Sequence, residues 1–292
     1  MVKSRGISMN TRNDSYRARK TIYTTLLWII LGGLVIAQLF PLLWVASYSL
    51  QKSGDLFGPE LFKLPKEPQW QNYLRAWKDG KIPAYLLNTL KIVIPSVTGA
   101  TLLSFGLAYA CTRMEWKMKP LAWFFVTIGL TIPIHTTLLP NFIWYRFFGL
   151  IDTHLGLIIS YIAFSLSFNT IVFSGLLAGI PKSMEESAFI DGAGYGRILS
   201  QIIAPMAATG FATVGVQTFL NHWNEFIMAN TYLASEIKRT LPFSIIRFQG
   251  EYSSDYAVQF ACMTLVALPP LVLYFIFNRW ILAGVTAGAV KG

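Results

Sequence analysis

Long apolar runs without a charged side chain alternate with short polar segments along this chain. Six of these runs, each 21 to 31 residues long, contain no Asp, Glu, Lys or Arg: Thr21–Gln51, Ile92–Thr112, Pro120–Tyr145, Thr153–Pro181, Ile198–Asn224 and Tyr256–Asn278. A helix of about 20 apolar residues crosses the roughly 30 Å hydrocarbon core of a bilayer. The runs lack the period-two alternation of barrel strands, and helices satisfy their backbone hydrogen bonds internally. The pattern therefore predicts an all-α membrane protein with six transmembrane helices.

Composition and the placement of charge agree with this class and orient the chain. Charged residues make up only 13% of the 292 residues, against about 25% in soluble domains. Six of the 24 basic residues lie within residues 1–20, and basic segments beside a span favour the cytoplasmic side. Three more follow the second run and agree with this orientation: Arg113, Lys117 and Lys119. Because six spans return the C-terminus to the same side, both termini are expected in the cytoplasm, and the net charge of +10 needs no nucleic acid to explain it.

The same pattern divides the chain into an arm and one membrane domain. Residues 1–20 are expected to form a cytoplasmic N-terminal arm, and residues 21–292 a transmembrane domain that ends in a cytoplasmic tail, residues 280–292. No segment between the runs is long enough to fold alone as a soluble domain. After the first run, four bulky residues at helical spacing predict a short amphipathic helix at the membrane interface: Trp70, Tyr73, Leu74 and Trp77.

Proline residues fall inside the third run, at Pro133 and Pro140. Proline removes a helix hydrogen bond and kinks the axis, although spanning helices often tolerate it. Two interpretations stay open: ordinary tolerated kinks, or kinks that shape a pathway and let it open and close.

The fifth run carries amide side chains on one face. Gln217, Asn221 and Asn224 are spaced i, i+4 and i+7, so a helix places them in one stripe. Polar groups at membrane depth usually face a bundle interior or a watery cavity. The stripe is therefore a candidate lining for a polar solute's pathway, or a set of hydrogen bonds to another subunit. Three aromatic residues are candidates for the apolar part of such a pathway, or for an interfacial belt: Trp144, Tyr145 and Trp223.

A polar island of residues 182–197 separates the fourth and fifth runs, and a candidate loop of about residues 182–205 extends from it to Pro205. Ser183 and Glu186 have the spacing of a capping box, in which the two side chains bond each other's backbone N–H groups at the start of a helix. Gly192 favours the end of that helix. The island therefore predicts a short helix over about Met184–Ala193, and then a second short helix that leads into the fifth run.

Acidic and small side chains share this predicted helix, which makes it a candidate docking site. Fixed charges that could orient a partner come from Glu185, Glu186 and Asp191. Small residues would keep one face thin, so that a partner surface approaches closely: Ala188, Gly192 and Ala193. The alternative is a capped connecting loop without a partner, since capping boxes are common.

The island resembles the EAA loop of the permease subunits of bacterial ABC importers, which reads Glu-Ala-Ala-x-x-Asp-Gly-Ala and is followed by a proline. Glu186-Ser187-Ala188 stands for the opening triplet, and Asp191-Gly192-Ala193 and Pro205 match in kind and spacing. Ser187 replaces the second alanine, and Ala204 stands where a larger aliphatic residue usually precedes the proline. Five further stretches resemble the carbohydrate-importing subgroup, above all the shorter permease of maltose-type systems: Thr131–Pro133, Trp223–Phe226, Arg239–Pro242, Phe248–Tyr252 and Gly284–Gly292.

The resemblance implies a type I ABC importer permease fold in a bacterial inner (cytoplasmic) membrane. It implies a heteromeric complex with a second permease subunit, two ATPase subunits that bind ATP and Mg²⁺, an extracytoplasmic solute-binding protein, and a di- or oligosaccharide as cargo in the lipid bilayer. The residues it assigns to ATPase coupling are Glu185, Glu186, Ala188, Asp191, Gly192 and Pro205. In maltose-type systems the other permease supplies most sugar contacts, so the stripe on the fifth run stays a set of pathway candidates.

No catalytic, cofactor or metal site is expected in this chain itself. The sequence has no Gly-x-x-x-x-Gly-Lys-Ser/Thr phosphate loop, so ATP hydrolysis is assigned to a partner. Its three histidines show no metal-ligand spacing. Two alternatives remain: an ABC permease for a non-sugar solute and, less favoured, a secondary transporter, which typically needs ionisable residues inside its spans.

Overall fold

The computed structural model of the protein describes residues 5–54, 64–250 and 254–289, and places side chains between residues 19 and 278 of those ranges. In this part of the chain helices are joined by turns and loops, with one isolated bridge between Gln249 and Ser254, so the predicted all-α class is confirmed. Several predicted features lie outside the described residues: residues 1–4 of the arm, Glu251 and Tyr252, and residues 290–292 of the tail.

Four helices are each long and apolar enough to cross a membrane. They are α1 (Arg5–Tyr48), α3 (Ile82–Thr112), α6 (His154–Ala178) and α13 (Tyr256–Ala289). Each of them coincides with all or most of one charge-free run of the sequence. α1 and α13 continue beyond their runs, because α1 already begins at Arg5 within the predicted arm, and α13 reaches Ala289 within the predicted tail.

The third and fifth runs form bent pairs of helices. α4 (Lys119–Thr131) and the segment made of η2 (Ile134–Thr137) and α5 (Leu138–Phe147) meet at 100°. The bend falls at Ile132 and Pro133, which both have extended backbone, whereas Pro140 lies in the first turn of α5, where it breaks no helix hydrogen bond. The second pair meets at 80° and consists of α8 (Tyr195–Ile198), η3 (Leu199–Ile203) and α9 (Ala204–Met206) on one side and α10 (Ala208–Asn224) on the other. If each bent pair counts as one span, the described chain has the six predicted spans.

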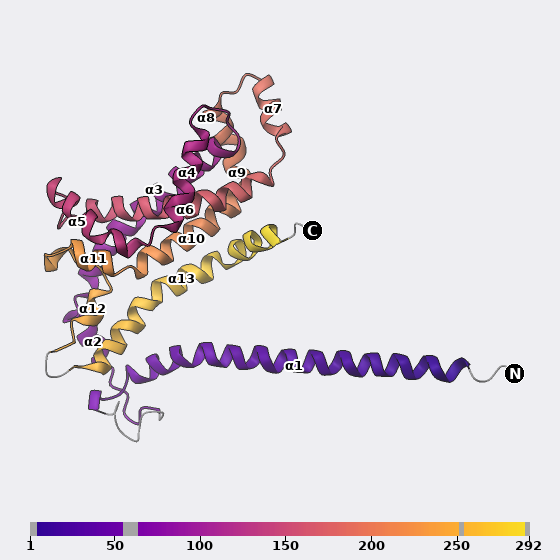
Figure 1. Cartoon of the computed structure of the whole chain (residues 1–292). Coiled ribbons are helices and arrows are strands. Elements are labelled where there is room, and N and C mark those ends of the chain that lie inside the picture. The colour runs from indigo at the N-terminus through magenta and orange to yellow at the C-terminus, as the bar shows by residue number, and fades with distance from the viewer. Residues whose placement is uncertain (1–4, 55–63, 251–253, 290–292) are drawn as a thin grey trace.

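α3 and α6 pack along each other at the centre of the bundle, α10 packs on both of them, and α13 packs on α10 (Figure 1). The buried apolar side chains form two clusters. The first, the loop-end core, joins α2 (Gln71–Lys78) and α11 (Ile227–Tyr232) to the bundle and includes Tyr85, Leu157, Trp223, Tyr232 and Val258. The second, the island-end core, lies toward the polar island and includes Tyr109, Phe173, Leu177, Ala188 and Ile203.

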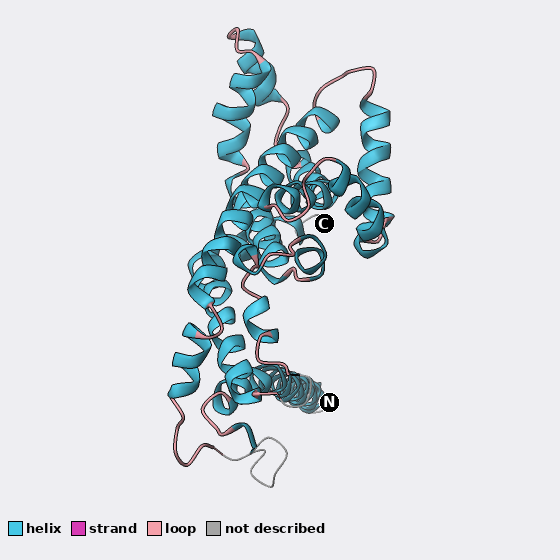
Figure 2. Ribbon diagram, turned by 90° about the vertical axis from the view of Figure 1, so that its left-hand side faces the viewer, coloured by secondary structure: helices cyan, strands magenta, loops and turns pink. Residues whose placement is uncertain are grey.

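The loop end of the molecule carries α2 and the short helices that follow α10. Figure 2 looks onto this end, where η4 (Glu236–Lys238) and α12 (Phe243–Ile246) complete the set. The predicted short helix is confirmed as α2, which buries Asn72 and Ala76 and leaves Leu74, Trp77 and the N-cap residue Trp70 exposed; its place at the membrane interface stays a prediction. Asn72 donates two hydrogen bonds of 2.9 Å to the carbonyls of Ser49 and Gln51, which ties α2 to the end of α1.

α1 leaves the bundle and extends away from it (Figure 1). Its large apolar side chains between Ile22 and Leu43 are 42% to 73% exposed, and the helix packs mainly on α13 near its own end at Tyr48. So large an apolar surface is suited to lipid or to another protein chain. The first residues of α1 and the last residues of α13 lie on the same side as the polar island, opposite α2 and α11, as an even number of spans requires (Figure 1). That this side is the cytoplasm stays a prediction.

Candidate functional site

The polar island folds as α7 (Ser183–Ile190), which projects from the bundle beside α8 (Figure 1). The predicted capping box does not form. Lys182 has helical backbone angles (φ −64°, ψ −28°), so Ser183 already lies inside the helix, where its hydroxyl cannot cap, and no side-chain cap bond is present at this N-terminus. The helix also ends at Ile190, three residues before the predicted Ala193.

Gly192 ends α7 as predicted, through a left-handed turn. Its φ is +81°, a conformation that side chains with a Cβ rarely adopt. The Gly192 N–H donates to the Phe189 carbonyl at 3.0 Å, and the Ala193 N–H donates to the Ala188 carbonyl at 2.9 Å. These two bonds are those of a Schellman motif, and they turn the chain back toward α8.

The predicted coupling residues separate onto two faces of the island. Glu185 and Ala188, at i and i+3, point inward, and Ala188 is only 7% exposed because it packs into the island-end core. The expectation that Ala188 thins a partner-facing surface is therefore wrong: its small side chain lets α7 approach its own bundle. The remaining candidates are exposed: Glu186, Asp191, Gly192 and Pro205.

The exposed face of α7 is partly apolar, which the sequence reasoning missed. Ile190 is 86% exposed, and Met184 and Phe189 are 44% and 41% exposed. Phe189 packs edge-on against Tyr195 of α8, with ring centroids 4.9 Å apart. A shallow hollow beside this face is lined by Ser183, Met184, Ser187, Ala188, Asp191 and Ile202. Exposed apolar side chains together with free carboxylates are typical of a protein-docking surface.

Glu185 faces into the protein and joins a buried polar cluster. The Tyr109 hydroxyl of α3 donates to its Oε2 at 2.9 Å, and Nε of Arg113 lies 3.4 Å from its Oε1. Arg113 also donates to the carbonyls of Leu177 and Ile180 at the end of α6. The Arg113 and Glu185 side chains are only 6% and 8% exposed, so Glu185 is not open to a partner. The sequence marked Arg113 only as a basic loop residue, and no spacing rule pairs it with Glu185.

The amide stripe lies on an open face of α10. Gln217, Asn221 and Asn224 are all exposed, on one side of the helix as predicted. The Gln217 amide donates weakly to Asn221 at 3.4 Å, and Asn224 donates to the Leu220 carbonyl at 2.9 Å. Within this chain the stripe therefore keeps hydrogen-bonding capacity for a solute or for another subunit, and both interpretations stand.

The three aromatic candidates have different surroundings. Trp223 is 1% exposed and donates from Nε1 to the Val266 carbonyl at 3.2 Å, so this candidate lines no pathway and belongs to the loop-end core. The Tyr145 hydroxyl is bonded to Ser160 at 2.8 Å. Trp144 is 60% exposed and stacks on Phe148, and it remains available to lipid, solute or a partner.

Polar residues on the inner face of α10 hold the bundle together. The two ring nitrogens of His222 lie 3.0 Å from the Ser96 hydroxyl of α3 and 2.8 Å from the Ser165 hydroxyl of α6. Glu225, directly after α10, accepts the Tyr161 hydroxyl at 2.7 Å and the backbone N–H of Met228 at 2.7 Å. The hydrogen-bonding groups of His222 and Glu225 are thus used within the chain, which favours a structural role for both residues.

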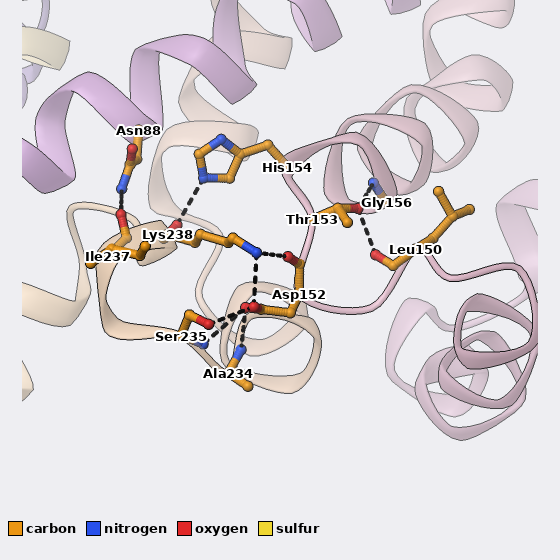
Figure 3. Close-up of polar contacts among 10 residues, drawn as sticks. All are labelled: Asn88, Leu150, Asp152, Thr153, His154, Gly156, Ala234, Ser235, Ile237 and Lys238. Carbon is orange, nitrogen blue, oxygen red and sulfur yellow. Dashed lines mark hydrogen bonds and ion pairs between the residues drawn. The ribbon is translucent and has the colours of Figure 1, made fainter.

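A second polar cluster ties the loop after α11 to the start of α6 (Figure 3). Asp152 accepts the backbone N–H groups of Ala234 and Ser235 at 3.0 and 2.9 Å, and also the Ser235 hydroxyl at 2.5 Å. The Lys238 ammonium lies 2.9 Å from the same carboxylate. Although burial alone would raise the pKa of Asp152, the hydrogen bonds from Ser235 and Lys238 outweigh it and hold the pKa well below its usual range.

Comparison with known proteins places this architecture in a family. Residues 100–287, more than half of the chain, match the family described as the binding-protein-dependent transport system inner membrane component. The chain belongs to this family. The family and the apolar helices together make it a multi-pass protein of the inner membrane.

Relatives of this inner membrane component cover nearly its whole length. The diacetylchitobiose uptake system permease protein NgcG of Streptomyces coelicolor is 31% identical, over 90% of this chain and 87% of its own. The trehalose transport system permease protein SugB of Mycobacterium tuberculosis is 31% identical, over 94% of this chain and 99% of its own. A chain from the crystal structure of a bacterial ABC transporter that imports alginate, at 21% identity, superposes with a TM-score of 0.78 over 89% of this chain and 97% of its own. The ABC importer permease fold is thereby shown.

Proposed function

We propose that this inner membrane component is one of two unlike permease subunits of an ATP-driven importer that carries a di- or oligosaccharide. The proposal rests on the two faces of α7. One face exposes apolar and acidic side chains, and the other holds the buried Glu185, which pairs with Arg113 of the bundle. In this role two ATPase subunits bind and hydrolyse ATP with Mg²⁺, and an extracytoplasmic binding protein delivers the sugar. The chain itself has no catalytic task.

The exposed face of α7 is the surface on which an ATPase subunit would dock. Glu186 and Asp191 are free to meet basic groups, and the 86% exposed Ile190 offers an apolar contact between them. When the ATPase subunits close on ATP, the docked α7 would move with them. The bundle would then shift between inward-open and outward-open states, because the ATPase pair binds one of those states more tightly.

The solute class rests on the relatives and on the chemistry of α10. NgcG and SugB carry the names of diacetylchitobiose and trehalose systems. Sugar hydroxyls need both donors and acceptors, and the amides of Gln217, Asn221 and Asn224 supply both from one exposed face. A permease for a non-sugar solute is the second candidate, and a secondary transporter the third.

Affinity purification from native membranes in mild detergent tests the assembly. We expect a second multi-span permease and an ATPase subunit to copurify with this chain, identified by mass spectrometry. A chain that purifies alone and still moves a sugar in liposomes would contradict the proposal and favour a secondary carrier.

Reversing the charge on the docking face tests the role of α7. Glu186→Lys should uncouple ATP hydrolysis from uptake and leave insertion intact, because the side chain is exposed and supports no internal contact that the structure shows. Glu115→Lys is the matched control, since Glu115 is an acid of a neighbouring loop whose side chain is 90% exposed. Normal uptake by Glu186→Lys would exclude this face from coupling.

A further inference from the structure

We infer that Arg113, Glu185 and Tyr109 form a transmission junction: the buried contact through which a displacement of α7 reaches α3 and α6 together. Arg113 and Glu185 are then positioning residues for the coupling of ATP hydrolysis to transport. The inference rests on the proposed function, because it assigns the path by which docking at α7 moves the bundle.

Apart from its chain connections to α6 and α8, α7 makes no extensive contact with another helix of the described chain. Among the described residues, the extensive helix–helix contacts involve α3, α6, α10 and α13, and α7 takes part in none of them. Its inward face offers the bundle two side chains, Glu185 and Ala188. Ala188 fills a space in the island-end core, whereas Glu185 makes the directional contacts.

Arg113 connects Glu185 to two helices at once. It lies at the C-cap of α3, where its backbone N–H donates to the Tyr109 carbonyl at 2.8 Å. Its guanidinium reaches the carbonyls of Leu177 and Ile180, which lie in the last turn of α6 and just beyond it. Carbonyls at a helix end have no partner within the helix, so a cation that binds them fixes that end. α3 and α6 form the most extensive helix pair of the molecule, and the junction therefore acts on the centre of the bundle.

The geometry favours a junction that holds α7 at a defined distance and can tighten. Both charged side chains are less than a tenth exposed, so removal of one leaves an uncompensated charge in a largely buried site. The Tyr109 hydroxyl satisfies Glu185 Oε2, while Oε1 lies 3.4 Å from Arg113 Nε and has no hydrogen bond within the described residues. A small movement of α7 toward α3 would complete that bond.

The test uses the complete importer, with its permease pair, ATPase subunits and binding protein, in liposomes. Glu185→Gln keeps the shape and the acceptor for Tyr109 but removes the charge. Arg113→Lys keeps the charge but loses the planar fork that serves several acceptors. For both variants we expect sugar transported per ATP hydrolysed to fall about fivefold or more, the lower end of ordinary coupling between two sites.

The ratio is measured only on complexes from which the ATPase still copurifies, because a purely structural role would change yield and stability without changing it. Glu115→Gln, which removes an exposed carboxylate beside Lys119, should leave the ratio unchanged. If Glu185→Gln or Arg113→Lys fails to assemble, Tyr109→Phe decides: it deletes one hydroxyl, keeps the ion pair, and should still lower the ratio. An unchanged ratio in the assembled variants overturns the junction.

The proposed function fails separately from this inference. A wild-type complex without ATP-dependent uptake would overturn the proposed function itself. The junction alone would be overturned by a different set of results. In that set the wild-type complex couples ATP hydrolysis to uptake and Glu186→Lys lowers the sugar transported per ATP, but Glu185→Gln leaves that ratio unchanged.

Discussion

Replacement of Asp152 by asparagine should release the loop after α11 from the start of α6. The asparagine Oδ1 can still accept the N–H groups of Ala234 and Ser235, but an NH₂ group replaces the Oδ2 atom that accepts from the Ser235 hydroxyl and Lys238. The Ser235 hydroxyl and the Lys238 ammonium, both donors to Oδ2 in the native protein, then face another donor group. Hydrogen bonds to a charged group contribute about 1.5–3 kcal/mol each. Because the Asp152 and Lys238 side chains are 24% and 37% exposed, we take the lower part of that range, about 2 kcal/mol for local opening.

Hydrogen exchange of the backbone amides measures this opening directly. A cost of about 2 kcal/mol corresponds to a roughly 30-fold loss of protection. In Asp152→Asn, we expect that loss at Ala234 and Ser235, whose N–H groups bond to the carboxylate. Glu67→Gln is the control: it removes another carboxylate of the loop end, whose side chain is 80% exposed, and should change nothing. Unchanged exchange in Asp152→Asn would refute the role given to this cluster.

The same cluster predicts a direction for the effect of pH. The pKa of Asp152 is lowered in the folded protein, chiefly by the hydrogen bonds from Ser235 and Lys238, which outweigh the effect of burial. A lowered folded-state pKa gives stability that is complete above the unfolded-state pKa and is lost as the pH falls through the folded-state value. Protection of the Ala234 and Ser235 amides should therefore persist at about pH 5 and disappear only in strong acid. Loss near pH 5 would show that the carboxylate is not held as described.

Two substitutions test the ends of α7 and α10. Gly192→Ala places a side chain at φ +81° and should weaken the turn by about 1 kcal/mol, seen as faster exchange of the Ala193 amide; Gly194→Ala, at φ −78° in open space, is the matched control and should have no effect. Trp223→Phe removes the donor to the buried Val266 carbonyl and should cost about 1–3 kcal/mol, measured as a lower melting temperature of the detergent-solubilised complex. An unchanged melting temperature would contradict the core role of this residue.

The spans were predictable because charge is excluded from hydrocarbon. Each charge-free run became a helix or a bent pair of helices, and the bend at Pro133 coincides with one of the two prolines singled out in the third run. A second short helix leading into the fifth run was predicted, but its 80° bend against α10 was not. The bend falls at Ala207, two residues after Pro205, and alanine gives no local signal for a turn.

Helical geometry alone argues against Trp223 as a candidate for the pathway. Successive residues turn by about 100° around a helix, so Trp223 points away from the stripe of Asn221 and Asn224. The structure places it, like His222, on the buried side of α10. A stripe of amides on one face therefore predicts that the large aromatic residue between them belongs to the core.

The contacts that anchor the island to the bundle could not be predicted from local pattern. Tyr109 and Glu185 are 76 positions apart, and the acceptors of Arg113 on α6 are backbone carbonyls, which any sequence provides. Likewise, Asp152 and Lys238 meet across 86 positions. Helix periodicity predicts which residues share a face, but which face is buried depends on how the helices pack. For this reason Glu185 and Ala188 proved buried and Glu186 exposed.

Reconstituted transport shows whether this protein belongs to an ATP-driven sugar importer. The copurified complex is placed in liposomes with the binding protein outside and ATP with Mg²⁺ inside, and uptake of labelled diacetylchitobiose and trehalose is followed, with an amino acid as the non-sugar control. The account predicts uptake of an oligosaccharide that requires both ATP and the binding protein. Sugar uptake without ATP, driven by an ion gradient, would contradict it.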